Sequence, residues 1–185
     1  MNLEKYQQYS RIARGLEKAD LVLKDARIVN VFTEEIIRGD IAIQDGIIAG
    51  IGSFHGKEER DLAGRYVCPG FIDSHLHLES TLVTPAELVT AASRHGTTTF
   101  IVDPHESANV SGLAGIDYIL DQTEDVKANV YVMMPSCVPA TAIDDNGCTL
   151  TAEDMVPYLH NSRILGLGEV MDSISVVQGE KSMHD

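Results

Sequence analysis

A fourfold alternation of short apolar runs and amphipathic segments, which begins near residue 66, most limits what this chain can fold into. Each run is nearly continuous in apolar residues and rich in β-branched ones, which is typical of strands buried on both faces of a parallel sheet. We predict an α/β fold whose parallel strands are joined by helices. The predicted strands are residues 66–78, 97–106, 128–137 and 163–170, and the predicted helices are residues 84–96, 112–127 and 151–161.

Capping residues mark the ends of two of these helices. Thr84 is suited to the N-cap, Pro85 to the first helical position, and Gly96 to the end of the helix. Thr151 can cap the last helix, and Pro157 is expected to kink it because proline cannot donate a backbone hydrogen bond.

The first part of the chain has a different pattern. Its polar start carries apolar residues at helical spacing and predicts an N-terminal helix. β-branched alternation follows, interrupted at Gly39-Asp40 and at Asp45-Gly46, where an Asp-Gly pair predicts a hairpin. We expect several short antiparallel strands and then a loop at residues 53–64. The predicted division is residues 1–18 (helix), 19–66 (small β segment) and 67–185 (parallel α/β region).

The charge balance excludes two classes of partner. The 185 residues include 28 acidic and 14 basic side chains, a formal charge of −14. Nucleic acids and anionic membrane surfaces are bound through basic residues, so we expect neither as a partner. The three cysteines form no CxxC pair and the N-terminus has no apolar signal segment, so we expect a cytoplasmic protein.

The stretch "VCPGFIDSHLHLES", residues 67–80, carries the most unusual chemistry. Four ionisable residues occupy alternate positions in it: Asp73, His75, His77 and Glu79. Alternate side chains of a strand share a face, so we expect all four to point the same way in a buried strand. Burying them together is costly unless a divalent cation compensates their charge and polarity. His75 and His77 are therefore candidate metal ligands, and a pair of hydrogen-bonded core histidines is the alternative.

Two further strand ends carry polar residues. Asp103, His105 and Glu106 end the second predicted strand, and Glu169 lies at the end of the fourth. Each alone is compatible with a surface or capping role. Because the carboxyl ends of parallel strands gather on one rim, where (β/α) barrels have their active sites, we expect these residues to converge there with the two histidines. A mononuclear or binuclear metal site is the better explanation of all three strand ends together.

These motifs resemble a known family. A small β segment followed by "PGFIDSHLHLE" and "HGTTT" is similar to the amidohydrolase superfamily. The longer strings "DPHESANVSG", "PSCVPAT" and "LGLGEVMD" resemble the adenine deaminase family within it, and the resemblance extends from residue 19 to the end of the sequence.

The resemblance implies the first half of a (β/α)8 TIM-type barrel, preceded by part of a composite β-sandwich domain. It also implies a binuclear centre of divalent metal, with manganese or iron favoured and zinc possible. His75 and His77 would bind one ion, and Glu169 would bridge both. A metal-bound hydroxide would then attack the purine base adenine and release hypoxanthine and ammonia. Glu169, His105 and Glu106 are the expected catalytic residues, and a homo-oligomer is the expected assembly.

The length departs from this expectation. A (β/α)8 barrel takes about 250 residues, and only four barrel strands are predicted here. We therefore expect an N-terminal portion that is unstable or oligomeric alone, and that lacks turnover without a C-terminal half. Two alternatives remain. One is another amidohydrolase, such as a cyclic-amide hydrolase or an amino-sugar deacetylase, and the other is a non-catalytic fragment that acts only as an assembly module.

Overall fold

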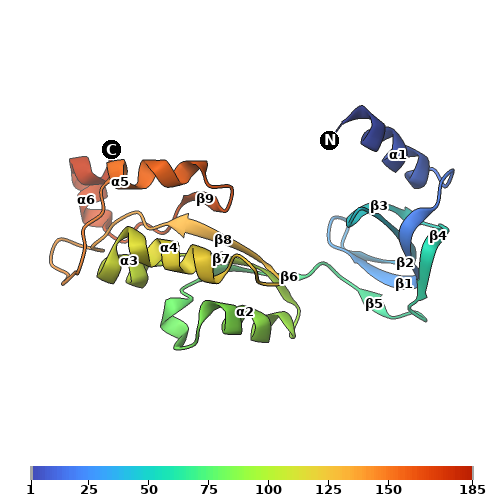
Figure 1. Ribbon diagram of the computed structural model, residues 1–185, viewed down its shortest axis with the longest axis horizontal. Coiled ribbons are helices and arrows are strands. Elements are labelled where there is room, and N and C mark those ends of the chain that lie inside the picture. The colour runs from blue at the N-terminus through green and yellow to red at the C-terminus, as the bar shows by residue number, and fades with distance from the viewer. Residues whose placement is uncertain (1, 185) are drawn as a thin grey trace. The chain divides into compact units, whose positions relative to one another are not determined.

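The chain forms two compact units in the computed structural model, which describes residues 2–184. The first unit covers residues 1–69 and the second covers residues 70–185 (Figure 1). No helix in the described part of the chain has both the length and the apolar character needed to cross a membrane.

The first unit is a β sheet with one helix. Its central strand pairs antiparallel with one neighbour, with a shift in register between Leu23 and Ala26, and parallel with another. The strand order is β3-β2-β1-β4, and β5 also pairs with β1. The elements are α1 (Leu3–Ala13), β1 (Ala19–Asn30), β2 (Glu35–Gln44), β3 (Ile47–Gly52), β4 (Gly56–Asp61) and β5 (Tyr66–Val67). The hairpin predicted at Asp45-Gly46 is confirmed, because both residues have the positive φ angles, 50° and 74°, that such a turn requires.

Three local predictions in this unit were wrong. The helix ends at Ala13, and Gly15 with a φ of +70° turns the chain out of it. Strand β2 runs through Gly39-Asp40 without a break. The expected loop at residues 53–64 contains strand β4. All residues of this strand after Gly56 are exposed. An edge strand of this kind forms through backbone pairing with β1, so it has no apolar alternation to reveal it.

A partly buried ion pair joins β1 and β2 in this unit. Asp40 is 8% exposed, and one of its carboxylate oxygens accepts a hydrogen bond from Lys24 Nζ. The same carboxylate accepts the backbone N–H groups of Asp25 and Phe54, each at 3.1 Å. Lys24 Nζ also donates to the Phe54 carbonyl at 2.8 Å. The Asp40 carboxylate thus accepts hydrogen bonds from three donors, two in β1 and one at Phe54.

The second unit contains a four-stranded parallel sheet in the order β6-β7-β8-β9, which confirms the predicted mixed α/β class. The strands are β6 (Phe71–Leu76), β7 (Thr97–Val102), β8 (Asn129–Met134) and β9 (Ile164–Leu167). The helices are α2 (Pro85–Ser93), α3 (His105–Ser111), α4 (Leu113–Gln122), α5 (Ala152–Met155) and α6 (Ser173–Gln178), with 3-10 turns η1 (Glu79–Thr81), η2 (Val156–His160) and η3 (Lys181–Met183).

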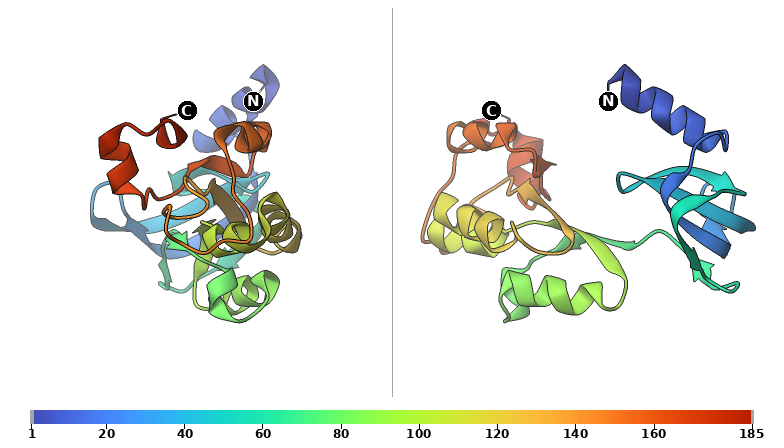
Figure 2. Two further views of the ribbon diagram at one scale, coloured as in Figure 1. Left: turned by 90° about the vertical axis from the view of Figure 1, so that its left-hand side faces the viewer. Right: turned by 45° about the vertical axis from the view of Figure 1, so that its right-hand side comes forward.

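Helices α2, α4 and α5 follow one another over one face of this sheet (Figures 1 and 2). Their apolar side chains and those of the strands form one buried core, which includes Val89, Phe100, Ile119, Val132 and Met155. The other face is less covered, since Ile101, Tyr131 and Met133 on it are only partly buried. This arrangement leaves the carboxyl ends of the four strands along one edge of the unit.

The structure corrects the predicted elements of this unit in three places. Strand β6 is shorter than expected and is not fully buried, because Phe71 and Ile72 are 62% and 63% exposed. Helix α3 was not predicted as a separate element, and Gly112 ends it before α4 begins. The last predicted helix becomes α5 and η2, because Pro157 cannot donate the hydrogen bond that would continue α5.

Candidate metal centre

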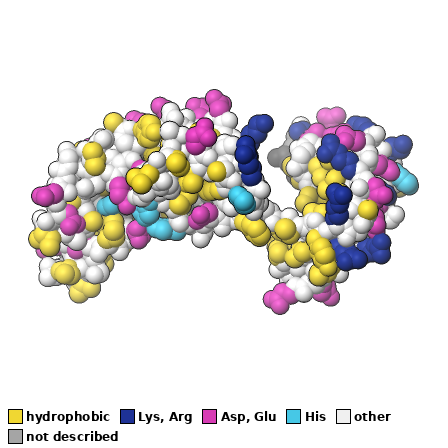
Figure 3. Space-filling model, turned by 90° about the horizontal axis from the view of Figure 1, so that it is seen from below, with side chains coloured by type: hydrophobic (Ala, Val, Ile, Leu, Met, Phe, Trp, Pro, Cys, Tyr) yellow, Lys and Arg dark blue, Asp and Glu magenta, His cyan; other side chains and the backbone are white. Residues whose placement is uncertain are grey.

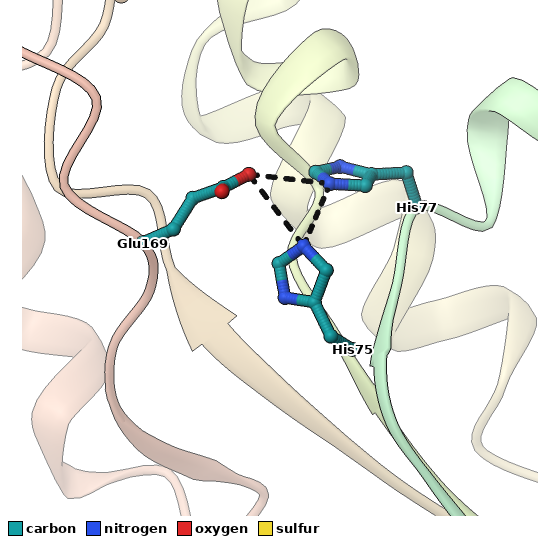
Figure 4. A group of neighbouring side chains, drawn as sticks. All are labelled: His75, His77 and Glu169. Atoms are coloured by element: carbon teal, nitrogen blue, oxygen red, sulfur yellow. Dashed lines mark hydrogen bonds and ion pairs between the residues drawn. The ribbon is translucent and has the colours of Figure 1, made fainter.

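His75, His77 and Glu169 meet at the carboxyl ends of β6 and β9 (Figure 4). The Nε2 atoms of the two histidines are 3.1 Å apart. Glu169 Oε1 lies 3.5 Å from His75 Nε2 and 3.4 Å from His77 Nε2. Parallel pairing across the sheet brings these side chains together although nearly a hundred positions separate them in the sequence.

The spacing of the three ligand atoms fits a metal ion. Atoms bound to a tetrahedral ion at about 2.0–2.1 Å lie about 3.3–3.4 Å from one another. The three observed separations lie within a few tenths of an ångström of that value. Two imidazoles and a carboxylate are also a common donor set for divalent transition metals. The side chains are 51%, 22% and 42% exposed, so an ion can reach them from solvent.

The backbone of Glu169 is fixed on both sides. Its N–H donates to Asp103 Oδ2 at 3.2 Å, and its carbonyl accepts a hydrogen bond from Ser136 Oγ. The preceding residue, Gly168, donates its N–H to the Met134 carbonyl at 2.6 Å. Burial raises the pKa of Asp103, and the Glu169 N–H partly offsets this. Residues from β7 and β8 therefore determine where the Glu169 side chain starts.

Replacing Gly168 with alanine tests this support. The added Cβ would overlap with Asp103 Oδ2 and lie 2.9 Å from Asp103 Cγ. Asp103 is only 1% exposed, so its carboxylate has little room to move aside. We expect a loss of about 1–3 kcal/mol in unfolding free energy and weaker metal binding, measured by thermal unfolding and by metal titration.

Gly52→Ala is the matched control for this substitution. Its added Cβ would meet nothing closer than Phe54 Cε2 at 3.4 Å, an ordinary contact. Metal binding by Gly168→Ala that matches both the wild type and this control would contradict the role of the Asp103 contact.

A second group of ligand atoms lies beside the first. It contains His77, Glu79 and Glu106, and it shares His77 with the first group. His77 Nδ1 is 2.9 Å from Glu106 Oε2. Glu79 Oε1 accepts the backbone N–H of Ser107 at 3.1 Å, which ties η1 to the first turn of α3. Glu79 and Glu106 also line a cavity of about 460 Å³ above α3 and α4.

The pKa values of the two carboxyl groups in this second group are shifted in opposite directions. Burial raises the pKa of Glu79, and the neighbouring Glu106 carboxylate raises it further. Burial acts on Glu106 in the same sense, but the N–H of its own backbone and the nearby His77 outweigh it, so the pKa of Glu106 is lowered. A proton held by this pair therefore resides on Glu79, and Glu106 is the ionised member.

The remaining predicted residues take other positions. His105 is 8% exposed at the start of α3, its Nδ1 has no hydrogen-bond partner, and it belongs to neither group of ligand atoms. Asp73 Oδ1 contacts the backbone N–H of His75 at 3.4 Å and also lies outside both groups. Glu79 does not continue the strand, because β6 ends at Leu76 and Glu79 begins η1. The expected row of four side chains on one strand face was therefore wrong.

The family model described as "Amidohydrolase family" matches residues 66–175, which is more than half of the chain. This chain belongs to the amidohydrolase family. The match contains the whole parallel sheet and both groups of ligand atoms.

Similar proteins of known name are adenine deaminases. An adenine deaminase of Desulfitobacterium hafniense is 57% identical over 183 residues, which are 99% of this chain and 32% of that protein. An adenine deaminase of Geobacillus kaustophilus is 49% identical over 91% of this chain and 29% of that protein. The chain thus spans about a third of the length of these relatives.

A solved structure supports the amidohydrolase fold. The N-acyl-D-glutamate deacylase from Bordetella bronchiseptica, complexed with zinc and a phosphonate inhibitor, matches with a TM-score of 0.52 and 22% sequence identity. The match covers 76% of this chain and 34% of that one. At this identity the likeness concerns the fold alone.

Proposed function

We propose that this chain is part of an adenine deaminase and carries the metal-binding start of its active site. The observation that carries the proposal is the triangle of His75, His77 and Glu169, whose three ligand atoms have the spacing of a metal site. The identity of 57% to a named adenine deaminase over nearly the whole chain supports the substrate. In the reaction, water and adenine give hypoxanthine and ammonia, which would place the protein in purine salvage in the cytoplasm.

The proposal includes the architecture. Residues 67–185 would supply the first four strands of a (β/α)8 barrel, and residues 19–66 would supply part of a small β domain, preceded by helix α1 (Leu3–Ala13). Four parallel strands in sequence order, with helices over one face and a partly uncovered second face, support this arrangement. The carboxyl ends of barrel strands are where such enzymes have their sites.

The residues divide the chemical work as follows. A divalent ion at this site supplies Lewis acidity and lowers the pKa of a water from about 16 to near 7. His75 and His77 would hold the ion through their ring nitrogens, and Glu169 would hold it through its carboxylate. Manganese or iron in a binuclear centre is part of the proposal. Glu169, and with it His105 or Glu106, would carry the proton to the departing amine.

The charge distribution favours capture of a cation. Residues 70–185 contain 17 acidic and four basic residues, a formal charge of −13, whereas residues 1–69 contain 11 acidic and ten basic residues. Most of the Lys and Arg side chains that are visible in Figure 3 belong to the first unit. A negative surface around a site raises the local concentration of cations.

An ammonia-release assay tests the proposed activity. The chain is assayed with manganese or iron, alone and together with the remaining two thirds of the Desulfitobacterium hafniense relative, expressed as a separate polypeptide or as a fusion. Substrates are adenine, adenosine, a cyclic amide and an N-acetylated amino sugar. Release from adenine alone supports the proposal. Turnover of the cyclic amide or the amino sugar instead would overturn it in favour of another amidohydrolase. A chain that binds neither metal and releases no ammonia from any of the four substrates, in either form, would favour an assembly module.

We also predict that the 185-residue chain associates with itself in the absence of further chain. Within residues 2–184, the outer edges of β6 and β9 have no strand partner, and Phe71, Ile72, Leu165 and Leu167 on these strands are more than half exposed. Open strand edges with apolar side chains favour pairing with another chain. Sedimentation equilibrium should show a mass that rises with concentration, and a monomer at all concentrations would contradict the prediction.

A further inference from the structure

His77 has a carboxylate at each of its two ring nitrogens. Nε2 faces Glu169 Oε1 at 3.4 Å and His75 Nε2 at 3.1 Å, within the candidate metal group. Nδ1 lies on the other side of the ring, 2.9 Å from Glu106 Oε2. The imidazole is therefore placed between the metal group and the start of α3.

The two nitrogens cannot serve two ions at once without loss of the ring proton. A neutral imidazole carries one N–H and one free lone pair, so an ion bound through Nε2 leaves the proton on Nδ1. That N–H is buried and forms no aligned hydrogen bond in this conformation, although Glu106 Oε2 is within reach. A small rotation of the half-exposed Glu106 side chain would complete the bond.

Glu106 is itself held beside His77. It lies in the first turn of α3, and Glu79 from η1 accepts the N–H of the next residue, Ser107. Glu79 thereby fixes the start of the helix that presents Glu106. Truncating the Glu106 side chain would remove the carboxylate that lies 2.9 Å from the buried Nδ1.

We propose that Glu106 is a positioning residue, which accepts the Nδ1–H of His77 and so fixes the ring with Nε2 turned toward the metal. This inference rests on the proposed metal site. It assigns Glu106 to positioning His77, which leaves Glu169 and His105 for the proton transfer proposed above. A carboxylate behind a ligand histidine typically changes metal affinity by about 10- to 100-fold.

The test compares Glu106→Ala and Glu106→Gln with wild type in the 185-residue chain. Zn²⁺ affinity is measured by competition with a chelator. The tautomer of His77 in the Zn²⁺-loaded chain is read from two-bond ¹H–¹⁵N correlations, which suit a 20.1 kDa protein. Glu87→Gln is the matched control, because it removes an exposed glutamate from the first turn of another helix.

We expect wild-type His77 as the Nδ1–H tautomer. Glu106→Ala should lose about 10- to 100-fold in affinity and show mixed tautomers or a mobile ring, whereas Glu106→Gln, whose amide oxygen can still accept, should lose less. Glu87→Gln should stay within twofold of wild type. An unchanged tautomer or an unchanged affinity in Glu106→Ala overturns the proposal. If that variant does not fold, Glu106→Gln decides by the same two readouts.

These readouts separate the inference from the proposed function. If the chain binds Zn²⁺ and shows the Glu106 effects but forms no hypoxanthine with the added C-terminal part, only the proposed deaminase activity is contradicted. If adenine is deaminated but the Glu106 substitutions do not affect His77, only the positioning role is contradicted. A wild-type chain that binds no Zn²⁺ through His77 overturns the inference.

Discussion

Replacing His77 with alanine is expected to reduce metal affinity by more than about 100-fold, which exceeds the typical effect of a residue that only supports a ligand. His77 Nε2 is one of three ligand atoms within 3.5 Å of one another, and two remaining donors hold an ion poorly. The fold should tolerate the change, because His77 follows the end of β6 and is not part of the apolar core. Titration with Mn²⁺ or Zn²⁺ against a chelator measures the effect.

His95→Ala is the matched control for this experiment. His95 is exposed and follows helix α2, outside both groups of ligand atoms, so its removal should leave metal affinity within twofold of wild type. His75→Ala should behave like His77→Ala, since its Nε2 has the same two neighbours. Equal metal affinity in wild type, His75→Ala and His77→Ala would show that the triangle is only a hydrogen-bonded cluster.

The sequence predicts the meeting of His75, His77 and Glu169 for a general reason. Each residue follows or ends a strand, and the alternation of strands and helices implies a parallel sheet whose carboxyl ends share one edge. No knowledge of side-chain contacts is needed for that step.

The support around Glu169 could not be predicted in the same way. Asp103 was recognisable as a polar strand end, but its hydrogen bond to the Glu169 N–H depends on the register between β7 and β9, which are not adjacent. Ser136 contacts the Glu169 carbonyl from the loop after β8, although the predicted strand extended to residue 137. Gly168 offers a usable signal in retrospect, because a glycine directly before a functional carboxylate can mark a close approach of another chain segment.

The strand pattern also misplaced Glu79 for a physical reason. The apolar and polar residues of "HLHLE" alternate, which predicts that the strand continues to Glu79. The strand instead ends at Leu76, and Glu79 begins a 3-10 turn. Leu78 is completely buried there and anchors the turn on the core. The carboxylate is consequently directed to the start of α3, where it accepts the Ser107 N–H, and not to the face of β6.

Replacing Asp40 with alanine is expected to destabilise the first unit by about 1–3 kcal/mol, the usual cost of leaving buried hydrogen-bond donors without an acceptor. The substitution removes the acceptor for the Asp25 and Phe54 N–H groups, and it leaves Lys24, whose side chain is 27% exposed, without its carboxylate partner. Because the chain has two units, denaturation of the whole chain can have several steps. Native-state hydrogen exchange of β1 and β2 amides reports on the first unit directly.

The matched control is Glu58→Ala in the same unit. Glu58 pairs with Arg60 at 2.7 Å on the surface, with both side chains more than half exposed. Exposed pairs contribute about 0–1 kcal/mol, so amide protection in β1 and β2 should change little. Loss of protection in Glu58→Ala equal to that in Asp40→Ala would contradict a special role for the partly buried pair.

The pH dependence of Asp40→Ala gives an independent check. Burial acts to raise the pKa of Asp40, but Lys24 and the two backbone N–H groups outweigh it, so the folded pKa lies below the ordinary value of 3.8. A lowered folded pKa stabilises the protein above the unfolded pKa, and this stabilisation disappears as the pH falls through the folded value. The difference in protection between wild type and Asp40→Ala should therefore be constant near neutral pH and shrink below about pH 3.8. A difference that persists unchanged into strong acid would mean that packing around residue 40, and not its charge, stabilises the unit.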